Sequence, residues 1–197
     1  MKKTRLAVAA VAALALVFTS TPAQAYGGAA PAGTIVDVAV AASGGGTPDS
    51  NPWDYDILVQ AVVATGLNGA LADAGQTYTV FAPNDRAFLR LVTDLTGTAP
   101  ASEAAALSTI TSTFTTEQIS NILLYHVVAG DKLGPVKVIT AGSLTMANGG
   151  IVKPRGITLR DETPALSDPR LVPWAINIPA TNGVIHTIDR VLVPAQP

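Results

Sequence analysis

Thr181-Asn182-Gly183-Val184-Ile185-His186-Thr187-Ile188-Asp189-Arg190-Val191-Leu192-Val193-Pro194 is the stretch that the rest of the chain is organised around. Asn-Gly is a strong hairpin signal, because a type I′ turn needs positive φ at two successive residues, which Asn tolerates and Gly adopts without strain. We therefore predict a turn at Asn182-Gly183, which joins a strand in residues 174–178 to a following strand rich in Val and Ile. Apolar residues occupy both faces of the second strand, so we expect it to be central and buried.

The first 25 residues have the pattern of a cleavable secretory signal. Three of the first five residues are basic, residues 6–18 are almost wholly apolar, and Ala23-Gln24-Ala25 is a small-residue cleavage site. The alternative is a retained membrane helix, for which the apolar run is short and wrongly flanked. We expect cleavage after Ala25 and export of the mature chain to the extracellular space or the periplasm.

The expected mature chain is acidic. The whole sequence carries 12 basic and 14 acidic residues, and 3 of the basic ones lie in the leader, so 9 remain against 14, a net charge of −5. This balance argues against nucleic acid and anionic lipid headgroups as partners. The sequence has no cysteine, which excludes a disulfide framework. We expect one domain that folds as a monomer without crosslinks and has no membrane span after cleavage.

Small residues, glycine and proline dominate the start of the mature chain. Residues 26–33 predict a flexible lead-in, whereas residues 34–42 contain Ile35, Val36, Val38 and Val40 and by propensity favour a strand. Residues 43–52 hold three consecutive glycines and two prolines, which indicate a loop. A loop of this length is a place for function, although a neutral insertion also costs little.

Helix signals recur along the first two thirds of the chain. Asp54 and Asn84 stand at N-cap positions, Asp85 lies in the first turn after Asn84, and Thr115 with Gln118 matches a capping box. Gly66 provides a left-handed stop for the first of these helices. We expect helices over residues 54–65, 67–74, 84–95, 102–111 and 115–126, with Leu95 on the buried side of the third.

Strand signals are concentrated in the second half of the chain. Residues 78–81 form an early strand, and the later candidates are residues 136–140, 143–146, 151–153 and 157–160, separated by Gly, Pro and Asn-Gly-Gly turns. Helices followed by strands indicate an α+β domain with segregated layers.

No catalytic or metal-binding motif stands out. The sequence lacks a Gly-x-Ser-x-Gly elbow, a His-Glu-x-x-His motif, a phosphate-binding loop and an Asp-x-Asp-x-Asp-Gly calcium loop, and two histidines without cysteine make a poor zinc site. We interpret Asp161-Glu162 as a solvated turn, and Arg155, Arg160 and Arg170 as dispersed solvated charges. We therefore expect no catalytic residues, no cofactor and no metal.

Three segments taken together resemble the fasciclin-like domain family. The run Thr79-Val80-Phe81-Ala82-Pro83-Asn84-Asp85-Arg86-Ala87-Phe88 is similar to its first conserved block, Tyr125-His126 to its Tyr-His motif, and the C-terminal stretch to its second conserved block. The resemblance covers residues 34–195 as a single domain, of the secreted bacterial single-domain type. It implies a mostly antiparallel β-sheet wedge with several short helices packed on it, the two conserved blocks as adjacent strands, and a short helix within residues 34–42.

The resemblance implies a secreted, non-enzymatic interaction or adhesion module that mediates cell-surface or extracellular-matrix association. Its partner would be an extracellular protein or polysaccharide. The alternative is an extracellular carrier or sensor of a small apolar or haem-like ligand, because a Tyr-His pair can ligate haem iron. Adjacent residues on a helix point in different directions, which favours a structural role for Tyr125 and His126. We expect His126 to be buried and to bond a backbone carbonyl or Asp85.

Asn177-Ile178 is the remaining candidate binding element. These residues occupy the positions at which some animal members of the family carry the Asp-Ile pair of an integrin-type motif. A neutral Asn cannot replace a carboxylate as a ligand for a hard cation. We therefore expect no integrin-type binding through Asn177 and Ile178.

Overall fold

The computed structural model describes residues 31–197, so the predicted signal segment and the first five residues of the predicted lead-in lie outside the described residues. The helices are α1 (Ile35–Ala42), α2 (Asp56–Ala64), α3 (Asn68–Leu71), α4 (Asp85–Thr96), α5 (Glu103–Thr113), α6 (Thr116–Leu124) and α7 (Pro135–Thr140). The strands are β1 (Tyr78–Pro83), β2 (Val127–Ala129), β3 (Leu144–Thr145), β4 (Ile151–Arg155), β5 (Thr158–Arg160), β6 (Ile178–Ala180) and β7 (Gly183–Ile188).

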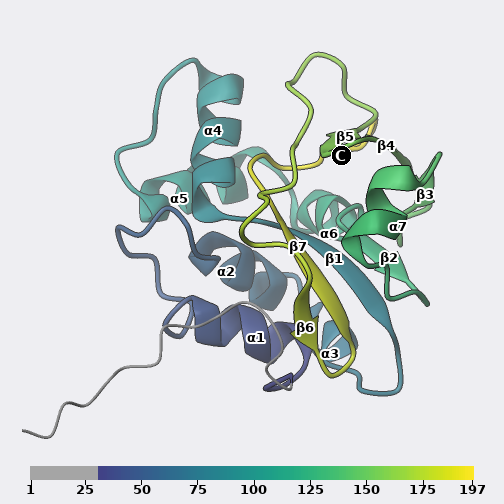
Figure 1. Cartoon of the computed structure of the whole chain (residues 1–197). Helices are drawn as coiled ribbons and strands as arrows, with labels where there is room; N and C mark the ends of the chain where they lie inside the picture. The colour runs from purple at the N-terminus through teal and green to yellow at the C-terminus, as the bar shows by residue number, and fades with distance from the viewer. Residues whose placement is uncertain (1–30) are drawn as a thin grey trace, which may run out of the picture.

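The strands form two sheets. A four-stranded sheet has the order β2-β1-β7-β6, and a three-stranded sheet has the order β3-β4-β5 (Figure 1). At the centre of the larger sheet β1 runs parallel to β7, with Val80 opposite Ile185, while the other pairings are antiparallel. The two conserved blocks are therefore adjacent strands, as the resemblance implies.

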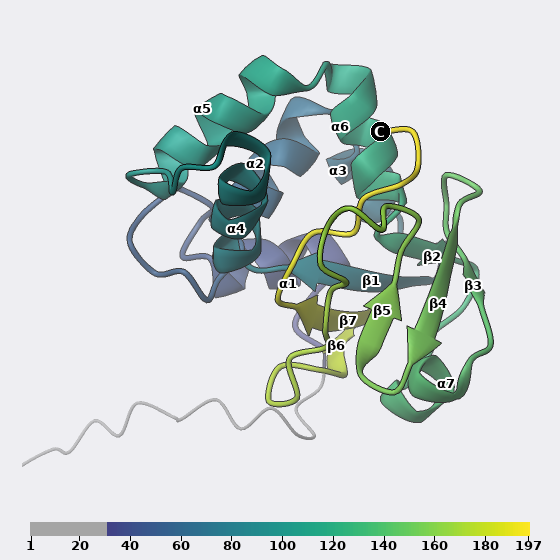
Figure 2. The same cartoon turned by 90° about the horizontal axis from the view of Figure 1, so that it is seen from above.

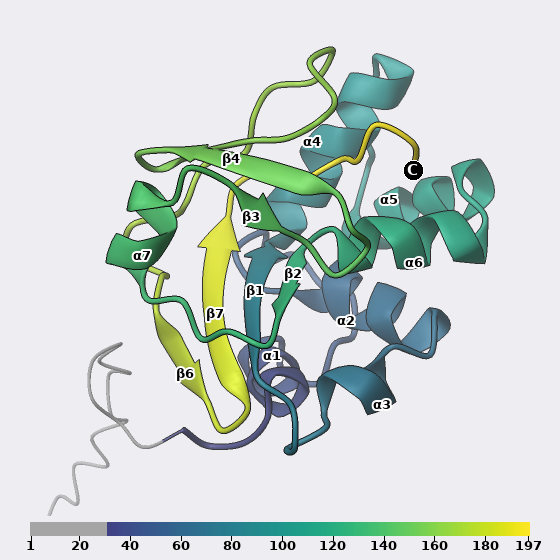
Figure 3. The ribbon, with the colours of Figure 1, turned by 90° about the vertical axis from the view of Figure 1, so that its right-hand side faces the viewer.

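Alternate residues of the central strands face two separate cores. Val80 and Ile185 belong to a larger core with the helices, whereas Phe81 and Ile188 belong to a smaller core with the second sheet. Figure 2 shows α2, α4, α5 and α6 on one side of the central sheet, and β4, β5 and α7 on the other. In Figure 3, β3 and β4 run across the direction of β1 and β7. The expected α+β class is confirmed, with a parallel pair at the centre of a mostly antiparallel arrangement.

The hairpin before β7 differs from the prediction. Strand β6 ends at Ala180 and β7 begins at Gly183, so the two loop residues are Thr181 and Asn182, and neither Asn182 nor Gly183 has positive φ. The predicted type I′ turn at Asn182-Gly183 is therefore wrong. Asn182 is used for its side chain, because Oδ1 accepts the N–H of Ile35 at 2.8 Å and Nδ2 donates to the carbonyl of Leu71 at 2.8 Å.

The lack of a side chain at Gly183 permits the parallel pairing. A Cβ at this position would collide with the backbone oxygen of Tyr78 on β1 and would press on the Ile35 side chain. The N–H of Tyr78 also bonds the carbonyl of Asn182 at 2.9 Å, at the point where the two strands begin. Gly183 therefore serves close approach of two strands rather than a turn.

Two other segments that were predicted as strands are not strands. Residues 174–178 are irregular up to Asn177, whose φ of 59° breaks the extended backbone before β6 begins. Residues 136–140 lie in α7, because Pro135 occupies the first helical position after the Gly134 N-cap, where its missing N–H costs nothing. Val138 is the one buried residue of α7, so this helix packs against the protein through a single buried side chain.

Two of the three predicted helix N-caps are present. Asn84 caps α4 and the Thr115–Gln118 box caps α6, as expected. A Thr34–Asp37 capping box starts α1, so the helix that the resemblance implies is present and the strand that propensity favours is wrong. Leu95 is 43% exposed, so its predicted burial is wrong. The end of the lead-in is tied down, since the Gly33 carbonyl accepts the N–H of Thr181 at 2.8 Å.

Asp54 does not cap the helix that follows it. The N-cap of α2 is Tyr55, and the free N–H groups of Asp56 and Ile57 donate instead to the two carboxylate oxygens of Asp85 at 3.0 and 2.8 Å. The first conserved block therefore supplies the cap of α2 from 29 residues away. No helix in residues 31–197 is long and apolar enough to cross a bilayer.

Substitution of Gly183 tests the close approach of β1 and β7. We expect Gly183→Ala to lower the free energy of unfolding by about 3 kcal/mol, because the new methyl group forces the strands apart. Chemical denaturation measures this change. Gly142→Ala is the control, since nothing lies within 4 Å of a Cβ at that exposed glycine, and it should change stability by less than about 0.5 kcal/mol. Equal stability of the two variants would contradict the packing argument.

Candidate functional site

Tyr125 lies at the end of α6 and is fully buried in the smaller core. Its hydroxyl donates to the carbonyl of Ile151 at 2.9 Å, at the start of β4. Burial raises the pKa of this phenol far above its usual value, and the carboxylates Asp161 and Glu162 raise it further. Tyr125 therefore links the helical layer to the second sheet and offers no free polar group to a ligand.

His126 connects three parts of the fold. Its Nδ1 lies 2.7 Å from the carbonyl oxygen of Ile122, and its Nε2 accepts the N–H of Leu192 at 2.9 Å. Because a backbone N–H must donate to Nε2, the ring is the Nδ1–H tautomer. Its own carbonyl accepts the N–H of Phe81 in β1 at 2.9 Å. The expected carbonyl partner is present, whereas Asp85 bonds the start of α2 instead.

The surroundings of His126 leave little room for a bound molecule. The apolar cavity beside it has a volume of about 50 Å³ and is lined by side chains of α1, α2 and β1. A cavity of roughly 150 Å³ is needed to hold even benzene. Since both ring nitrogens are also bonded within the protein, neither this cavity nor the Tyr125-His126 pair fits a porphyrin.

Asn177 and Ile178 point to different environments. Asn177 is exposed in the left-handed conformation, and its N–H donates to Nδ1 of His186 at 3.2 Å. Ile178 is buried in the larger core as the first residue of β6. His186 is itself buried, stacks on Phe81 with ring centroids 5.9 Å apart, and bonds the Leu133 carbonyl through Nε2 at 2.8 Å. The two sequence-predicted residues therefore do not form a joint contact surface.

Asp161 and Glu162 do not form the solvated turn that the sequence predicted. The carboxylate of Asp161 accepts the N–H groups of Thr163 and Val193 at 3.0 Å each, and Glu162 accepts the N–H of Ile151 at 2.8 Å. Both side chains are half-buried. They fasten the C-terminal segment to the second sheet, because that segment has no strand partner for its backbone N–H groups.

Strand register brings together basic side chains that the sequence analysis treated as dispersed. Lys153 lies opposite Arg160 in the β4–β5 pair, Arg155 lies opposite Thr158, and Thr158 in turn bridges to Arg170. The intervening residues of both strands are buried, so the four charged side chains share the outer face and are exposed. We call Lys153, Arg155, Arg160 and Arg170 the basic face.

A groove of about 380 Å³ runs along this face. Lys153, Arg155 and Arg160 line it together with Asp161 and Glu162. Both acids are committed to backbone N–H groups, as described above. The two ion pairs among the described residues, Arg90–Asp189 and Arg190–Asp94, do not involve the basic face. Its cations therefore have no ion-pair partner among residues 31–197, while the charges of Asp161, Glu162 and Asp168 beside them lower the net positive charge of the groove.

A cluster of acidic side chains surrounds the start of α2. Asp54, Asp56, Asp85 and Glu103 are all buried, and Asp49 lies beside them on the preceding loop. Burial raises the pKa of Asp85 well above its usual range, and the adjacent Asp54 carboxyl adds to this effect. Burial likewise raises the pKa of Asp56, with repulsion from Asp54 and Asp49 as further causes. These are the residues that could hold a cation.

The fold and these contacts define a small α+β domain, in which the Tyr-His pair and both conserved blocks serve packing. The sequence profile described as "Fasciclin domain" matches residues 54–194, and the chain belongs to the fasciclin domain family.

Relatives and solved structures agree with this assignment. An uncharacterized protein of Synechocystis, sll1735, is 30% identical over 141 residues, which are 71% of this chain and 89% of the relative. Protein sll1483 of the same organism is 28% identical over 140 residues, 71% of this chain and 67% of that protein. The structure of a FAS1 domain pair from the insect cell adhesion molecule Fasciclin I matches with a TM-score of 0.57 at 15% identity. That match covers 83% of this chain and 51% of the insect chain, so this chain spans about half of the domain pair.

The buried histidine predicts a specific loss of stability in acid. Burial lowers the pKa of His126 to about 4 from 6.5, so the unfolded chain takes up a proton at a higher pH than the folded one. The contribution of neutral His126 is complete above about pH 6.5 and is lost as the pH falls towards about 4, by roughly 3 kcal/mol in total. Urea unfolding of the wild type and His126→Gln across this range measures it.

The difference between the free energies of unfolding of the two proteins at each pH cancels the carboxyl groups that titrate in the same range. What remains is the contribution of His126. We expect His126→Gln to be less stable by about 1–3 kcal/mol at neutral pH, and the gap to narrow in acid. A gap that stays constant with pH would show that His126 is not held neutral by the fold.

Proposed function

We propose that the protein is a secreted, non-enzymatic adhesion module, and that its basic face binds an acidic extracellular polysaccharide. Fasciclin domains are common in adhesion-related proteins, are typically extracellular and are generally non-enzymatic. The observation that carries the proposal is the exposed cluster of Lys153, Arg155, Arg160 and Arg170 on a chain that is acidic elsewhere. It contains 4 of the 9 basic residues that remain after the leader.

The chemistry of the face suits carboxylate or sulfate groups on a linear chain. Three of the four cations are arginines, whose planar donors bind such groups in a bidentate way. Lys153, Arg155 and Arg160 line a polar groove rather than an apolar pocket, and an apolar pocket is the usual centre of a tight protein–protein contact. A polysaccharide with one anionic group per repeat fits an open row of cations better than a folded protein does. A protein partner is the outcome that the test below would reveal.

The carrier function is not adopted. It depended on Tyr125 and His126, and the contacts of both residues, together with the small cavity beside His126, give it no support.

The basic face is tested by binding to immobilised heparin, with neutral dextran as the reference surface. We expect retention on heparin that weakens with salt, and a loss of roughly tenfold or more in affinity for the double variant Arg155→Gln/Arg160→Gln. The double variant Arg86→Gln/Lys132→Gln removes the same charge from exposed residues elsewhere and should bind almost normally. Equal losses in both double variants would show a non-specific charge effect. Absence of polysaccharide binding, with capture of an acidic protein through the same arginines, would replace the polysaccharide by a protein.

Export is tested separately. Expression of the full chain in a secreting host should yield a mature protein that begins at Tyr26, because Ala23-Gln24-Ala25 has the small-residue pattern that signal peptidase requires. Intact mass measurement of the released and cell-associated fractions identifies the N-terminus. We expect a monomer in the released fraction. A cell-associated protein that retains residues 1–25 would favour a membrane anchor instead.

A further inference from the structure

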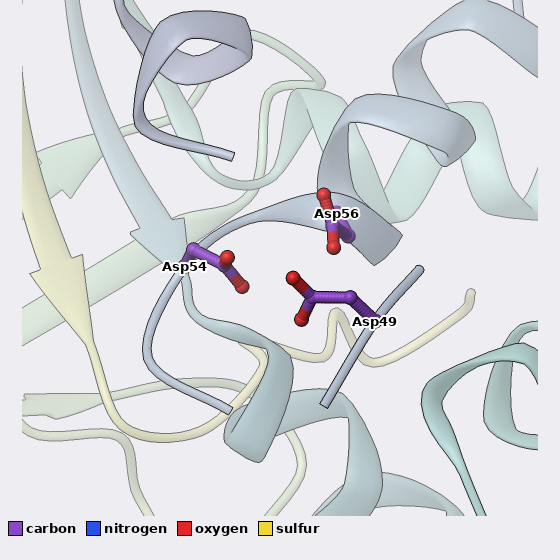
Figure 4. Close-up of side chains that lie close together, drawn as sticks. All are labelled: Asp49, Asp54 and Asp56. Atoms are coloured by element: carbon purple, nitrogen blue, oxygen red, sulfur yellow. The ribbon is translucent and has the colours of Figure 1, made fainter. Parts of the chain in front are cut away.

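We propose that the loop before α2 and the first turn of α2 form a binding site for Ca²⁺, with the carboxylates of Asp49, Asp54 and Asp56 as ligands. One carboxylate oxygen from each residue lies within 4.8 Å of the other two. Figure 4 shows the three carboxylates directed towards a common space between the loop and the helix. The spacing of these residues differs from a standard calcium loop, which is why the sequence alone predicted no metal.

Unpartnered oxygens of buried carboxylates point to a missing ligand. Asp56 is 0% exposed, and neither of its carboxylate oxygens has a hydrogen-bond partner among the described residues. Asp54 is 7% exposed, and its Oδ1 is also without a partner there. A buried carboxylate that is neither paired nor hydrogen-bonded is costly, so buried charges in proteins are normally paired or bound to metals.

The surrounding protein does not provide the counter-charge. Nδ2 of Asn51 donates to Oδ2 of Asp54 at 2.9 Å, and the N–H of Asn51 donates to Oδ1 of Asp49 at 2.6 Å, so each of these acids keeps one oxygen for another partner. The guanidinium of Arg86 lies over the Trp53 ring, 5.0 Å from its centroid. Neither ion pair among the described residues involves the three acids. A cation from solution would supply the charge.

A second trio, made of Asp54, Asp85 and Glu103, is a weaker candidate. Both oxygens of Asp85 accept N–H groups of α2, and Oε2 of Glu103 accepts the N–H of Asp49 at 2.8 Å. These two acids therefore build the scaffold, since Asp85 holds the start of α2 and Glu103 holds the loop. The open oxygens lie in the first trio.

The chemistry of the donors favours Ca²⁺ over other common ions. Ca²⁺ binds carboxylate oxygens at about 2.3–2.6 Å in flexible geometry, whereas Mg²⁺ needs about 2.0–2.1 Å in a strict octahedron and gives up its waters reluctantly. Zn²⁺ prefers nitrogen and sulfur ligands, which the trio lacks. Asp49 is exposed and provides a route for the ion and for the waters that complete its shell. With three carboxylates from the protein, we expect the weak affinity of extracellular modules, with a dissociation constant on the order of 0.1–1 mM.

Terbium luminescence and thermal unfolding of the purified full-length protein test the site. Tb³⁺ replaces Ca²⁺ at oxygen sites, and Trp53 and Tyr55 flank Asp54 in the sequence, so light absorbed by these rings should excite a bound ion. We expect saturable Tb³⁺ emission at one ion per chain, its displacement by Ca²⁺, and a melting temperature that rises by about 3–6 °C in excess Ca²⁺.

Two variants and one control decide the assignment. Asp49→Asn changes an exposed ligand and should fold normally while it loses most of the emission and the Ca²⁺-dependent shift in melting temperature. Asp56→Asn should lose both responses and melt higher than the wild type without Ca²⁺, since it removes a buried charge. Asp131→Asn, an exposed acid away from the cluster, should respond like the wild type. The proposal is overturned if the wild type gives neither saturable emission nor a Ca²⁺ shift, or if Asp49→Asn and Asp56→Asn respond as the wild type does.

Discussion

The parallel pairing of β1 with β7 is the interaction on which the rest of the fold depends. These strands form the middle of the only sheet among the described residues that has a core on each side. Their alternate side chains contribute to both cores. The pairing starts where Tyr78 and Gly183 approach each other so closely that no side chain fits at position 183. A single glycine therefore permits the contact that joins the two conserved blocks.

Side chains and backbone groups next to this pair then position the helices. Asp85, the first residue of α4, accepts the first N–H groups of α2, while Phe81 on β1 donates its N–H to the carbonyl of His126. The ring of His126 bonds both the end of α6 and the segment after β7. Tyr125 and His126, which the sequence offered as a possible haem-ligand pair, are thus buried connectors. The two proposed binding sites use other residues: the exposed basic face on the second sheet, and the mostly buried acidic cluster at the start of α2.

Sequence reasoning predicted the elements that local chemistry determines. The capping box at Thr115 and Gln118 and the cap at Asn84 are contacts within one turn, so short-range patterns were sufficient. The predictions failed where a distant partner decides the structure. Asp54 has the right residue type for a cap, but Asp85 takes that role from another element. Asn182 lies in the hairpin turn, but without the positive φ of a type I′ turn, and its side chain bonds α3 and the start of α1. The basic face depends on the register of β4, β5 and Arg170, which no local pattern encodes.

The distance along the chain between β1 and β7 has a consequence for biogenesis. More than half of the sequence separates the two central strands, so the sheet cannot be completed until residues 183–188 have been synthesised. Contacts of such high sequence separation slow folding, because the chain must close a long loop before it gains the pairing energy. A polypeptide still emerging from the ribosome therefore stays without its central pair. If the chain is exported as proposed, that delay keeps it in the unfolded form that a narrow translocation channel accepts.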